Sequence, residues 1–481
     1  MKLDLRRQQM LLAGEWVDRT ETMEVRNPEN DQLVAIVPKA SKTDMEQAIT
    51  RAKEGAKASA ALPVYKRMAI LNRAADFVEA HKERFARTIA TEGSKTIREA
   101  RKETGRCVET LRLCAEEARR VTGETIPFDQ SPGGTGRFGY YERHPLGIIG
   151  AITPFNDPLN LVAHKIGPAI AAGNAIVLKP ATATPLSALL LAEAFMDAGL
   201  PKGILSVMTG LGSEVGDVLI THPDVRMVSF TGGMEAGLEI AKKAGLKKKS
   251  MELGSNSPVI VLEDAQIEDA VKANVSGAFW AAGQNCIGVQ RLYVHAEVYD
   301  HFKDLFVKQS CAYMMGEKLS EKTDMGPLIS EKEAKRVAFM VDDALRMGAV
   351  LLCGGKRSGA FYEPTVLENV PDECMLAKEE IFGPVVLLYK IKSLAEGIER
   401  ANQSEYGLHA GLFTENMNAV FQAIRELEAG GVMVNDSSDF RIDAMPFGGT
   451  KQSGLGREGV KFSILEMTEQ KVVCFKLRNN G

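Results

Sequence analysis

The chain has 481 residues, 45% apolar and 25% charged, a balance typical of soluble globular proteins and unlike that of fibrous or disordered chains. Its length is too great for one ordinary hydrophobic core, so two or three domains are expected. The formal net charge of -4 excludes a strongly basic surface, and we expect no nucleic-acid partner.

The N-terminal residues MKLDLRRQQM are charged and lack the apolar core of a signal peptide. No apolar stretch elsewhere approaches the roughly 18 residues that a membrane span needs. We therefore expect a cytoplasmic enzyme without a membrane partner. Seven scattered cysteines without CxxC pairs, and seven histidines without HExxH spacing, predict reduced thiols and no metal site.

Residues 42–122 carry apolar residues at helical spacing between charges, which predicts long amphipathic helices. The segment 123–145, GETIPFDQSPGGTGRFGYYERHP, has turn residues followed by aromatic alternation, which is typical of a β-hairpin. Such a hairpin is able to reach outside the globular body.

From residue 146, short β-branched runs alternate with helical segments. The first predicted strands are LGIIGAIT, NAIVLKP, ILSVMTG and VRMVSFTG, with helices near 159–172, 184–198 and 213–221. A second series runs from 258 to about 440 and includes SPVIVLEDA, QRLYVHA, AVLLCGG, VVLLYKI, HAGLFTE and GVMVND. The predicted fold class is therefore α/β, with two doubly wound parallel-sheet lobes that bind ligands at the carboxyl ends of their strands.

The dinucleotide pattern GxGxxG occurs twice, as GTGRFG (134–139) and GLGREG (454–459). Neither match follows a predicted strand and opens a helix within a βαβ unit, which is the context that brings a helix N-terminus to a pyrophosphate. We interpret both matches as accidental.

Polar side chains stand where the predicted strands end. Asn156, in AITPFNDP, offers an amide that can donate to a developing oxyanion, although a turn asparagine is the simpler reading. Lys179 ends the next strand and places an ammonium where a ribose or phosphate would lie. The glycine pair of FTGG allows the backbone to approach a pyrophosphate. Glu252 follows among small residues.

Cys286 lies in GQNCIGVQR, flanked by amides, glycine and small aliphatic residues. A free thiol has a pKa of about 8.5, so only a few per cent is thiolate at neutral pH. A nucleophilic role requires a base or oriented dipoles. We expect Glu252 to supply the base and a helix N-terminus after Cys286 to supply the dipoles. The other six cysteines are expected to be core or surface thiols.

The order of FTGG, ELGSNSP, GQNC, EEIFGPV (379–385) and PFGGTKQSGLGREG (446–459), with PFN upstream, resembles the aldehyde dehydrogenase superfamily. The likeness runs from LLAGEWVD near the N-terminus to the last strand, and the ELG and GQxC pair, about 30 residues apart, is highly specific. It implies NAD(P)-dependent oxidation of an aldehyde to its carboxylate. The nearest group is the lactaldehyde, semialdehyde and non-phosphorylating glyceraldehyde-3-phosphate dehydrogenases.

The resemblance also implies residue roles. Cys286 matches the nucleophile, Glu252 the general base, and Asn156, with the backbone N–H of Cys286, the oxyanion hole, while Lys165 matches a proton-relay lysine. The matching cofactor contacts are Thr153, Pro154, Phe155, Lys179, Thr182, Gly212, Gly232, Gly233, Leu253, Glu380 and Phe382.

Two departures from the common family pattern concern the nucleotide. Thr182 stands where many NAD-preferring members have a glutamate, and Gly233 replaces a common serine. A carboxylate about 4 Å from a 2'-phosphate would repel it by a few kcal/mol. Because threonine removes that repulsion and Lys179 remains, we predict a preference for NADP over NAD. Dual use with weak preference is the alternative.

The substrate pocket is expected to be polar. Asn285 stands where relatives that use phosphorylated aldehydes tend to carry arginine, and Asp157 replaces an apolar residue. Arg106 and Arg441 match positions that hold anionic tails, with surface salt bridging as the competing interpretation. These residues favour a short hydroxylated or acidic aldehyde of the lactaldehyde, glyceraldehyde, succinic semialdehyde or sulfolactaldehyde kind.

We predict a dinucleotide-binding domain from 1–122 and 146–254, and a catalytic domain over 255–455. Residues 123–145 and 467–481 form a bridging element in which the hairpin pairs with the C-terminal strand KVVCFKL, which implies a homodimer or homotetramer. Two other activities stay open: a CoA-acylating aldehyde dehydrogenase, which Glu252 disfavours, and a cysteine esterase, which lacks an evident histidine partner.

Overall fold

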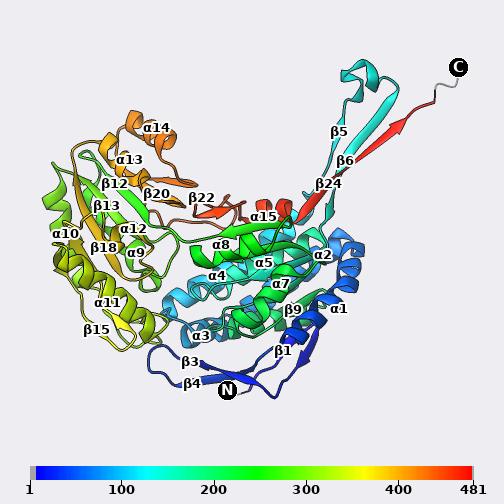
Figure 1. Ribbon diagram of the computed structural model, residues 1–481, viewed down its shortest axis with the longest axis horizontal. Helices are drawn as coiled ribbons and strands as arrows, with labels where there is room; N and C mark the ends of the chain where they lie inside the picture. The colour runs from blue at the N-terminus through cyan, green and yellow to red at the C-terminus, as the bar shows by residue number, and fades with distance from the viewer. Residues whose placement is uncertain (1–6, 479–481) are drawn as a thin grey trace.

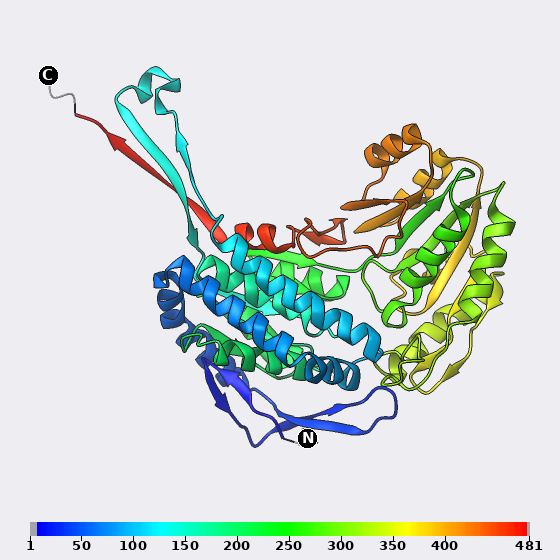
Figure 2. The same ribbon diagram turned by 180° about the vertical axis from the view of Figure 1, so that it is seen from behind.

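The computed structural model describes residues 7–478. Two lobes lie side by side, each built on a twisted sheet, and a narrow arm of strands projects from one of them (Figure 1, Figure 2). Residues 1–6 of the charged N-terminal segment, and residues 479–481 of the predicted bridging element, lie outside the described residues.

The first lobe contains an eight-stranded sheet in the order β2-β1-β9-β8-β7-β10-β11-β23. Its five central strands, β9 to β11 in this order, are parallel, and the strands β1, β2 and β23 at its two ends are antiparallel to their neighbours. Their bounds are β1 Met10–Leu12, β2 Glu15–Val17, β7 Ile148–Ile152, β8 Ala175–Lys179, β9 Leu205–Val207, β10 Val225–Thr231, β11 Lys248–Glu252 and β23 Gly454–Leu455.

Helices cover both faces of this sheet because its central strands are apolar on both sides. In β8, Ile176 and Leu178 pack into one apolar cluster and Val177 into the other. The helices of this lobe are α1 Lys42–Ala61, α2 Val64–Ala80, α3 Lys82–Glu92, α4 Ile97–Ala118, α5 Asn160–Ala172, α6 Leu186–Asp197, α7 Asp217–Thr221, α8 Met234–Lys243 and α15 Val460–Glu466.

The amphipathic helices predicted over 42–122 are confirmed as α1 to α4. Helix α4 begins with a capping box, in which the Thr96 hydroxyl accepts from the Glu99 N–H and the Glu99 carboxylate accepts from the Thr96 N–H. The helix expected near 213–221 is instead a π-helical turn, η3 Gly212–Gly216, followed by the short α7.

The second lobe contains a seven-stranded sheet in the order β14-β17-β18-β13-β12-β20-β21. Its strands are β12 Ser257–Val261, β13 Val289–His295, β14 Val350–Cys353, β17 Thr365–Glu368, β18 Val385–Ile391, β20 His409–Phe413 and β21 Gly431–Val434. Its helices are α9 Ile267–Phe279, α10 Tyr299–Cys311, α11 Glu331–Arg346, α12 Met375–Lys378, α13 Leu394–Asn402 and α14 Met417–Glu426.

Two details of this sheet correct the prediction. Strand β14, the AVLLCGG run, is antiparallel to β17, so it does not continue the parallel series. Strand β17 itself was not predicted because its four residues, TVLE, form too short a run to stand out. The remaining strands are parallel, which confirms the α/β fold class with two parallel-sheet lobes.

The arm is a three-stranded sheet of β5 Glu124–Ile126, β6 Arg137–Pro145 and β24 Thr468–Lys476. Strand β24 pairs antiparallel with β6 along the full length of both strands, which confirms the predicted pairing of the hairpin with the C-terminal strand. Both views show the arm extending away from the two lobes (Figure 1, Figure 2). Two 3-10 turns, η1 Phe128–Gln130 and η2 Pro132–Gly134, lie at its tip. The GTGRFG match begins at Gly134 and runs into β6, so it opens no helix of a βαβ unit.

Short strand pairs complete the fold: β3 Thr22–Arg26 with β4 Leu33–Pro38, β15 Arg357–Ser358 with β16 Phe361–Tyr362, and β19 Tyr406–Gly407 with β22 Thr450–Lys451. Across residues 7–478, no helix is both long and apolar enough to cross a membrane. The same residues contain no cluster of three or more histidine, cysteine or acidic side chains that could hold a metal ion.

Candidate active site

The carboxyl ends of β7, β8, β10 and β11 meet along one edge of the first sheet. The register places Ile152 of β7 beside Lys179 of β8, and Thr231 of β10 beside Glu252 of β11. The residues that follow these strands therefore lie close together, as the doubly wound pattern predicts. This edge brings together the segment 153–156, Lys179, the FTGG glycines and Glu252.

The second lobe contributes Cys286 through a tight loop that begins with η4 Trp280–Gly283. Ala281 and Ala282 both adopt left-handed backbone conformations, with φ of 50° and 56°. The Ala281 N–H donates to Glu99 at 2.8 Å. A Cβ at Gly283 would lie 2.1 Å from the Gly383 carbonyl oxygen, so only glycine fits there. Contacts with α4 and with Gly383 thus hold the loop in place.

The expectation of a helix N-terminus after Cys286 is wrong. Cys286 and Ile287 form a turn, and the chain then enters β13 at Val289. Only two residues separate the cysteine from this β-branched strand, which leaves no room for a helical turn. The thiol therefore has no helix dipole directly behind it.

Cys286 is half-buried and packs beside Ile287, Leu408 and Phe447. Burial raises the pKa of its thiol to about 12, with the positive charge of Arg441 opposing the shift and nearby carboxylates adding to it. The resting thiol is therefore protonated at neutral pH, so nucleophilic attack requires a base.

Glu252 is only 2% exposed, and within the described part of the chain neither of its carboxylate oxygens has a hydrogen-bond partner. Burial raises its pKa well above the ordinary value, and the charge of Glu458 raises it further, against the lowering effects of Lys165 and two arginines. A Cβ at Gly448 would come within 3.0 Å of Glu252 Oε1, so this glycine makes room for the carboxyl group. A buried carboxyl with a raised pKa suits a general base.

Lys165 is fully buried in α5 and forms an ion pair with Glu458. Burial alone would raise the pKa of Glu458, but the charges of Lys165 and Arg441 lower it to about 2. Glu458 lies in the GLGREG match, between the antiparallel edge strand β23 and α15, outside any βαβ unit. Because this match was interpreted as accidental, Glu458 was not predicted, although an acidic residue among glycines is a recognisable signal.

Arg441 is almost completely buried, with 7% of its side chain exposed. Its guanidinium lies 3.7 Å from the centroid of the Phe447 ring and 3.6 Å from the Glu458 carboxylate. Neither Nε nor Nη2 has a hydrogen-bond partner among residues 7–478. Buried donors without partners are rare in native proteins, so these two nitrogens indicate a missing acceptor.

The two predicted asparagines differ in their surroundings. The Asn156 side chain is half-buried and makes no hydrogen bond within residues 7–478, which leaves its amide available as a donor. Asn285 Oδ1 instead accepts weakly from the Ile287 N–H at 3.3 Å, so this side chain supports the turn that carries Cys286.

The predicted adenosine contacts lie together at the end of β8. Lys179 is 4% exposed, and burial lowers the pKa of its ammonium to about 8. Its Nζ donates to the Pro180 carbonyl at 2.8 Å and lies 3.4 Å from the Thr182 hydroxyl. A Cβ at Gly212 would stand 3.9 Å from the Lys179 side chain, so this glycine faces the same space.

The residues nearer the predicted pyrophosphate and nicotinamide also leave room for a ligand. Gly233 is the N-cap of α8, and nothing lies within 4 Å of a Cβ added there. The buried hydroxyls of Thr153 and Thr231 have no hydrogen-bond partner in the part of the chain that the structure describes. An open helix N-terminus beside unsatisfied hydroxyls fits a phosphorylated dinucleotide.

Four further predicted cofactor contacts are Pro154, Phe155, Glu380 and Phe382. The Ser255 N–H donates to Glu380 at 2.9 Å, and burial raises the pKa of that carboxyl to about 7. Phe382 adopts a φ of 46° and presents its ring edge-on to Phe155, with centroids 5.8 Å apart. Pro154 lies half-buried beside Phe155.

Gly232 and Leu253 support this region through packing. The Gly232 N–H donates to the Glu252 carbonyl at 3.0 Å. Leu253 is 6% exposed and packs so closely on Gly237 of α8 that a Cβ there would come within 2.3 Å of it.

A network of charged side chains surrounds Arg106 on α4. Arg106 donates to Asp443 at 2.8 Å and lies 3.4 Å from Asp157. Asp157 also pairs with Lys95, whose ammonium donates to Glu103 at 2.8 Å. His164 and Asn160 of α5 contact the same Asp443 oxygen at 2.8 and 3.1 Å. The guanidinium of Arg106 thus donates hydrogen bonds to two carboxylates, whereas Arg441 forms a longer ion pair with Glu458.

The model of the aldehyde dehydrogenase family matches residues 16–473. The chain belongs to the aldehyde dehydrogenase family. It is an oxidoreductase that acts on an aldehyde with a nicotinamide cofactor. Among curated relatives, aspartate-semialdehyde dehydrogenase 1 of Pseudomonas canavaninivorans is 50% identical, with 95% of this chain and 97% of the relative covered. A 3-sulfolactaldehyde dehydrogenase of Priestia aryabhattai is 45% identical, with 97% and 98% covered.

Solved structures of aldehyde dehydrogenases share the whole fold. Aldehyde dehydrogenase 21 of Physcomitrella patens, in complex with the reaction product succinate, has a TM-score of 0.97 at 40% identity and covers 99% of this chain and 100% of its own. Glyceraldehyde-3-phosphate dehydrogenase GapN of Methanocaldococcus jannaschii, complexed with NADP, has a TM-score of 0.92 at 41% identity, with 96% and 100% covered. An NAD+ complex from Bacillus cereus has a TM-score of 0.95 at 35% identity, with 98% and 97% covered.

The site of this aldehyde dehydrogenase contains side chains that sequence reasoning did not single out. They are Lys95, Glu103, Asn160, His164, Asp443 and Glu458, and each contacts a predicted site residue or one of its partners. Helical periodicity gave a signal for those on α4 and α5, because a polar residue in an otherwise apolar helix such as NLVAHKIGPAIAA requires a partner.

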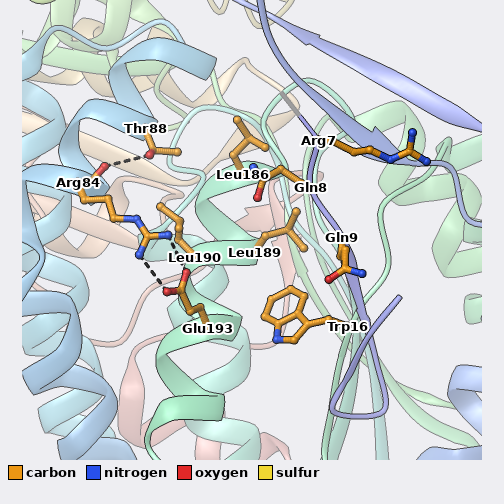
Figure 3. Close-up of a pocket in the computed structure, with 10 residues that line it drawn as sticks. All are labelled: Arg7, Gln8, Gln9, Trp16, Arg84, Thr88, Leu186, Leu189, Leu190 and Glu193. Atoms are coloured by element: carbon orange, nitrogen blue, oxygen red, sulfur yellow. Dashed lines mark hydrogen bonds and ion pairs between the residues drawn. The ribbon is translucent and has the colours of Figure 1, made fainter. Parts of the chain in front are cut away.

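A separate cavity of about 360 Å³ lies between the N-terminal strands and helices α3 and α6 (Figure 3). Arg84 and Glu193 form an ion pair at its wall, with N–O distances of 3.0 and 2.8 Å. None of the ten lining residues is a predicted site residue, so this cavity is distinct from the aldehyde dehydrogenase site.

Proposed function

We propose that this aldehyde dehydrogenase oxidises a short aldehyde with a carboxylate tail to the corresponding diacid, and that Arg441 holds the tail. The observation that carries this proposal is the pair of buried Arg441 nitrogens without acceptors, close enough to Cys286 to lower its pKa. A carboxylate accepts two parallel hydrogen bonds from one guanidinium, which would satisfy both donors.

The proposed chemistry uses Cys286, Glu252 and Asn156. The thiol sulfur bonds to the aldehyde carbon as its proton leaves to a base, and the Asn156 amide and the Cys286 N–H donate to the oxyanion. A bound nicotinamide would supply the acceptor for the hydride that leaves that carbon. Glu252 then takes a proton from water, whose oxygen attacks the thioester and releases the carboxylic acid and the thiol. Lys165, paired with Glu458, is proposed to pass protons away from Glu252.

For the nucleotide, we propose a preference for NADP. Thr182 places a hydroxyl beside the Lys179 ammonium. Lys179 can therefore pair with a 2'-phosphate without a competing carboxylate at position 182. The other proposed contacts are Thr153, Pro154, Phe155, Gly212, Gly232, Gly233, Leu253, Glu380 and Phe382. Initial rates with both nucleotides test the preference, and a specificity constant much higher for NAD would refute it.

Names of relatives support an acidic or polar aldehyde, since one acts on aspartate semialdehyde and another on 3-sulfolactaldehyde. The test is a comparison of succinic semialdehyde with butanal, which lacks the carboxylate, in the wild type and in Arg441→Met. We expect the wild type to prefer the acid at least tenfold and Arg441→Met to lose that preference. Equal use of both aldehydes by the wild type would overturn the proposal. Product analysis with and without CoA separates it from acyl-CoA formation.

We propose that residues 1–122 and 146–254 bind the dinucleotide and that residues 255–455 carry the catalytic loop. We also propose that the arm bridges subunits of a homodimer or homotetramer. Support for bridging comes from side chains exposed on the arm, including Phe138, Val472 and Phe475, which are 48 to 61% exposed. Strand β21 ends the second sheet and offers an unpaired edge. Light scattering of the protein tests this arrangement. Cytoplasmic location stays a prediction.

A further inference from the structure

The charged side chains around Arg106 do not form a favourable binding site for an anion alone. Two cations, Lys95 and Arg106, face three carboxylates, Glu103, Asp157 and Asp443, all joined by hydrogen bonds or ion pairs. This cluster therefore has a formal excess of one negative charge. A second anion placed against Arg106 would meet two carboxylates already bound to it, which is unfavourable in a partly dry pocket.

Asp157 is the most accessible carboxylate of this cluster. Its side chain is 18% exposed, whereas Asp443 and Glu103 are 3% and 1% exposed. It directly follows Asn156, the proposed oxyanion donor, on the same strand end. Each of its oxygens has one partner, Lys95 or Arg106, and a carboxylate can accept about four hydrogen bonds. Asp157 thus retains capacity for another donor.

The cluster also adjoins the proposed carboxylate receptor. Asp443 links Arg106 to His164 and stands two residues after Arg441 in the chain. Lys165, next to His164 on α5, pairs with Glu458, which in turn lies 3.6 Å from Arg441. The site therefore has two buried Arg441 nitrogens without hydrogen-bond acceptors among residues 7–478, close to a charge cluster with an excess of one negative charge. A ligand with one carboxylate and one cation matches both features.

We propose, building on the carboxylate tail of the proposed function, that the substrate is a short α-amino acid semialdehyde whose ammonium group is held by Asp157. The carboxylate lies against Arg441, and the ammonium donates to Asp157 Oδ1 or Oδ2. Asp157 is the specificity-determining residue for the amino group. Dianionic tails, such as phosphates, and neutral hydroxyl tails are poorer ligands for this arrangement.

The experiment uses two aldehydes that differ only in the amino group: L-aspartate β-semialdehyde and succinic semialdehyde. We expect the wild type to show a kcat/KM at least about tenfold higher for the amino aldehyde, equal to about 1.4 kcal/mol. In Asp157→Asn the ratio of the two kcat/KM values should fall to about one. The matched control, Asp197→Asn at the exposed end of α6, should keep the wild-type ratio.

The two-substrate ratio separates the possible failures. Equal or better use of succinic semialdehyde by the wild type overturns the ammonium proposal and leaves the carboxylate proposal standing. No nucleotide reduction with either aldehyde overturns the proposed function itself. If the Asp157→Asn substitution only disturbs the fold, both kcat/KM values fall together and their ratio stays unchanged. That result also contradicts the proposed role of Asp157.

A second measurement needs no substitution. The acids L-aspartate and succinate differ by the same amino group and are tested as inhibitors of the wild-type enzyme against succinic semialdehyde. The proposal predicts an inhibition constant for L-aspartate at least about tenfold below that for succinate. A constant for L-aspartate equal to or above that for succinate contradicts it.

Discussion

Lys165 and Glu458 form a buried ion pair across 293 residues of sequence, with side chains no more than 2% exposed. The pair joins helix α5, behind the proposed catalytic edge, to the loop before α15. It also supplies two of the charges that act on Glu252. This contact therefore links the stability of the lobe to the protonation of Glu252, the proposed general base.

Replacing Glu458 by glutamine should destabilise the protein, because it leaves the Lys165 ammonium buried beside Arg441 without a counter-ion. Loss of one partner of a buried pair typically costs about 3–5 kcal/mol. Urea denaturation measures the change, and Lys165→Met combined with Glu458→Gln should recover part of it. The exposed pair Lys57–Glu54 is the control: Glu54→Gln should cost at most about 1 kcal/mol.

Alkylation of Cys286 by iodoacetamide should accelerate steadily with pH in the nucleotide-free protein. Since burial raises the pKa of this thiol to about 12, its thiolate fraction grows about tenfold per pH unit between pH 7 and 10. The rate is followed by mass spectrometry of the Cys286 peptide, with Cys286→Ala as the blank for the other thiols. A plateau below pH 8 would mean that the resting thiol is already activated.

Asn156→Ala should bind NADP as the wild type does but lose roughly 10²- to 10³-fold in kcat, the usual effect of removing one oxyanion donor. Its amide makes no hydrogen bond within residues 7–478, so no structural contact is lost. Fluorescence titration with NADP and steady-state rates separate binding from turnover. Undiminished kcat would remove Asn156 from the mechanism.

The free energy of unfolding should fall as pH rises from 5 to 7 because of the raised pKa of Glu380. Burial raises the pKa of this carboxyl in the folded state to about 7, above the ordinary 4.5, so the folded state retains a proton that the unfolded state has lost. The contribution is fully lost above pH 7 and amounts to about 3 kcal/mol at most. Unfolding free energies of wild type and Glu380→Gln at several pH values isolate it. Parallel curves for the two proteins would contradict the assignment.

Thr182→Glu should reverse the nucleotide preference. The new carboxylate would compete for the Lys179 ammonium, 3.4 Å from the threonine hydroxyl, and repel a 2'-phosphate by a few kcal/mol. We expect kcat/KM for NADP to fall at least tenfold while that for NAD is less affected. Thr182→Gln, equal in size but uncharged, serves as the control. A similar loss in both variants would point to steric rather than electrostatic exclusion.

Many of the helices and strands of this protein could be predicted from the sequence, because the local pattern of apolar and polar residues determines secondary structure. Helical spacing predicted α1 to α6, and alternation of strands and helices predicted two parallel sheets. Short motifs singled out Cys286, Glu252 and Lys179 as candidates, since a polar or nucleophilic side chain stands out among small residues. The same reasoning failed for β14, whose direction depends on a partner strand, and for the helix expected after Cys286.

Only the tertiary structure decided which charges meet. The two partners of Arg106, Asp157 and Asp443, lie on separate segments, and Asp443 is 337 residues away. Nothing in the local sequence could show that this arginine is engaged while Arg441 keeps two buried nitrogens without acceptors. The electrostatic role of a side chain depends on its burial and on its distance from other charges, and folding sets both by bringing remote residues together. The type of each side chain and the spacing that builds each helix or strand are local properties of the sequence.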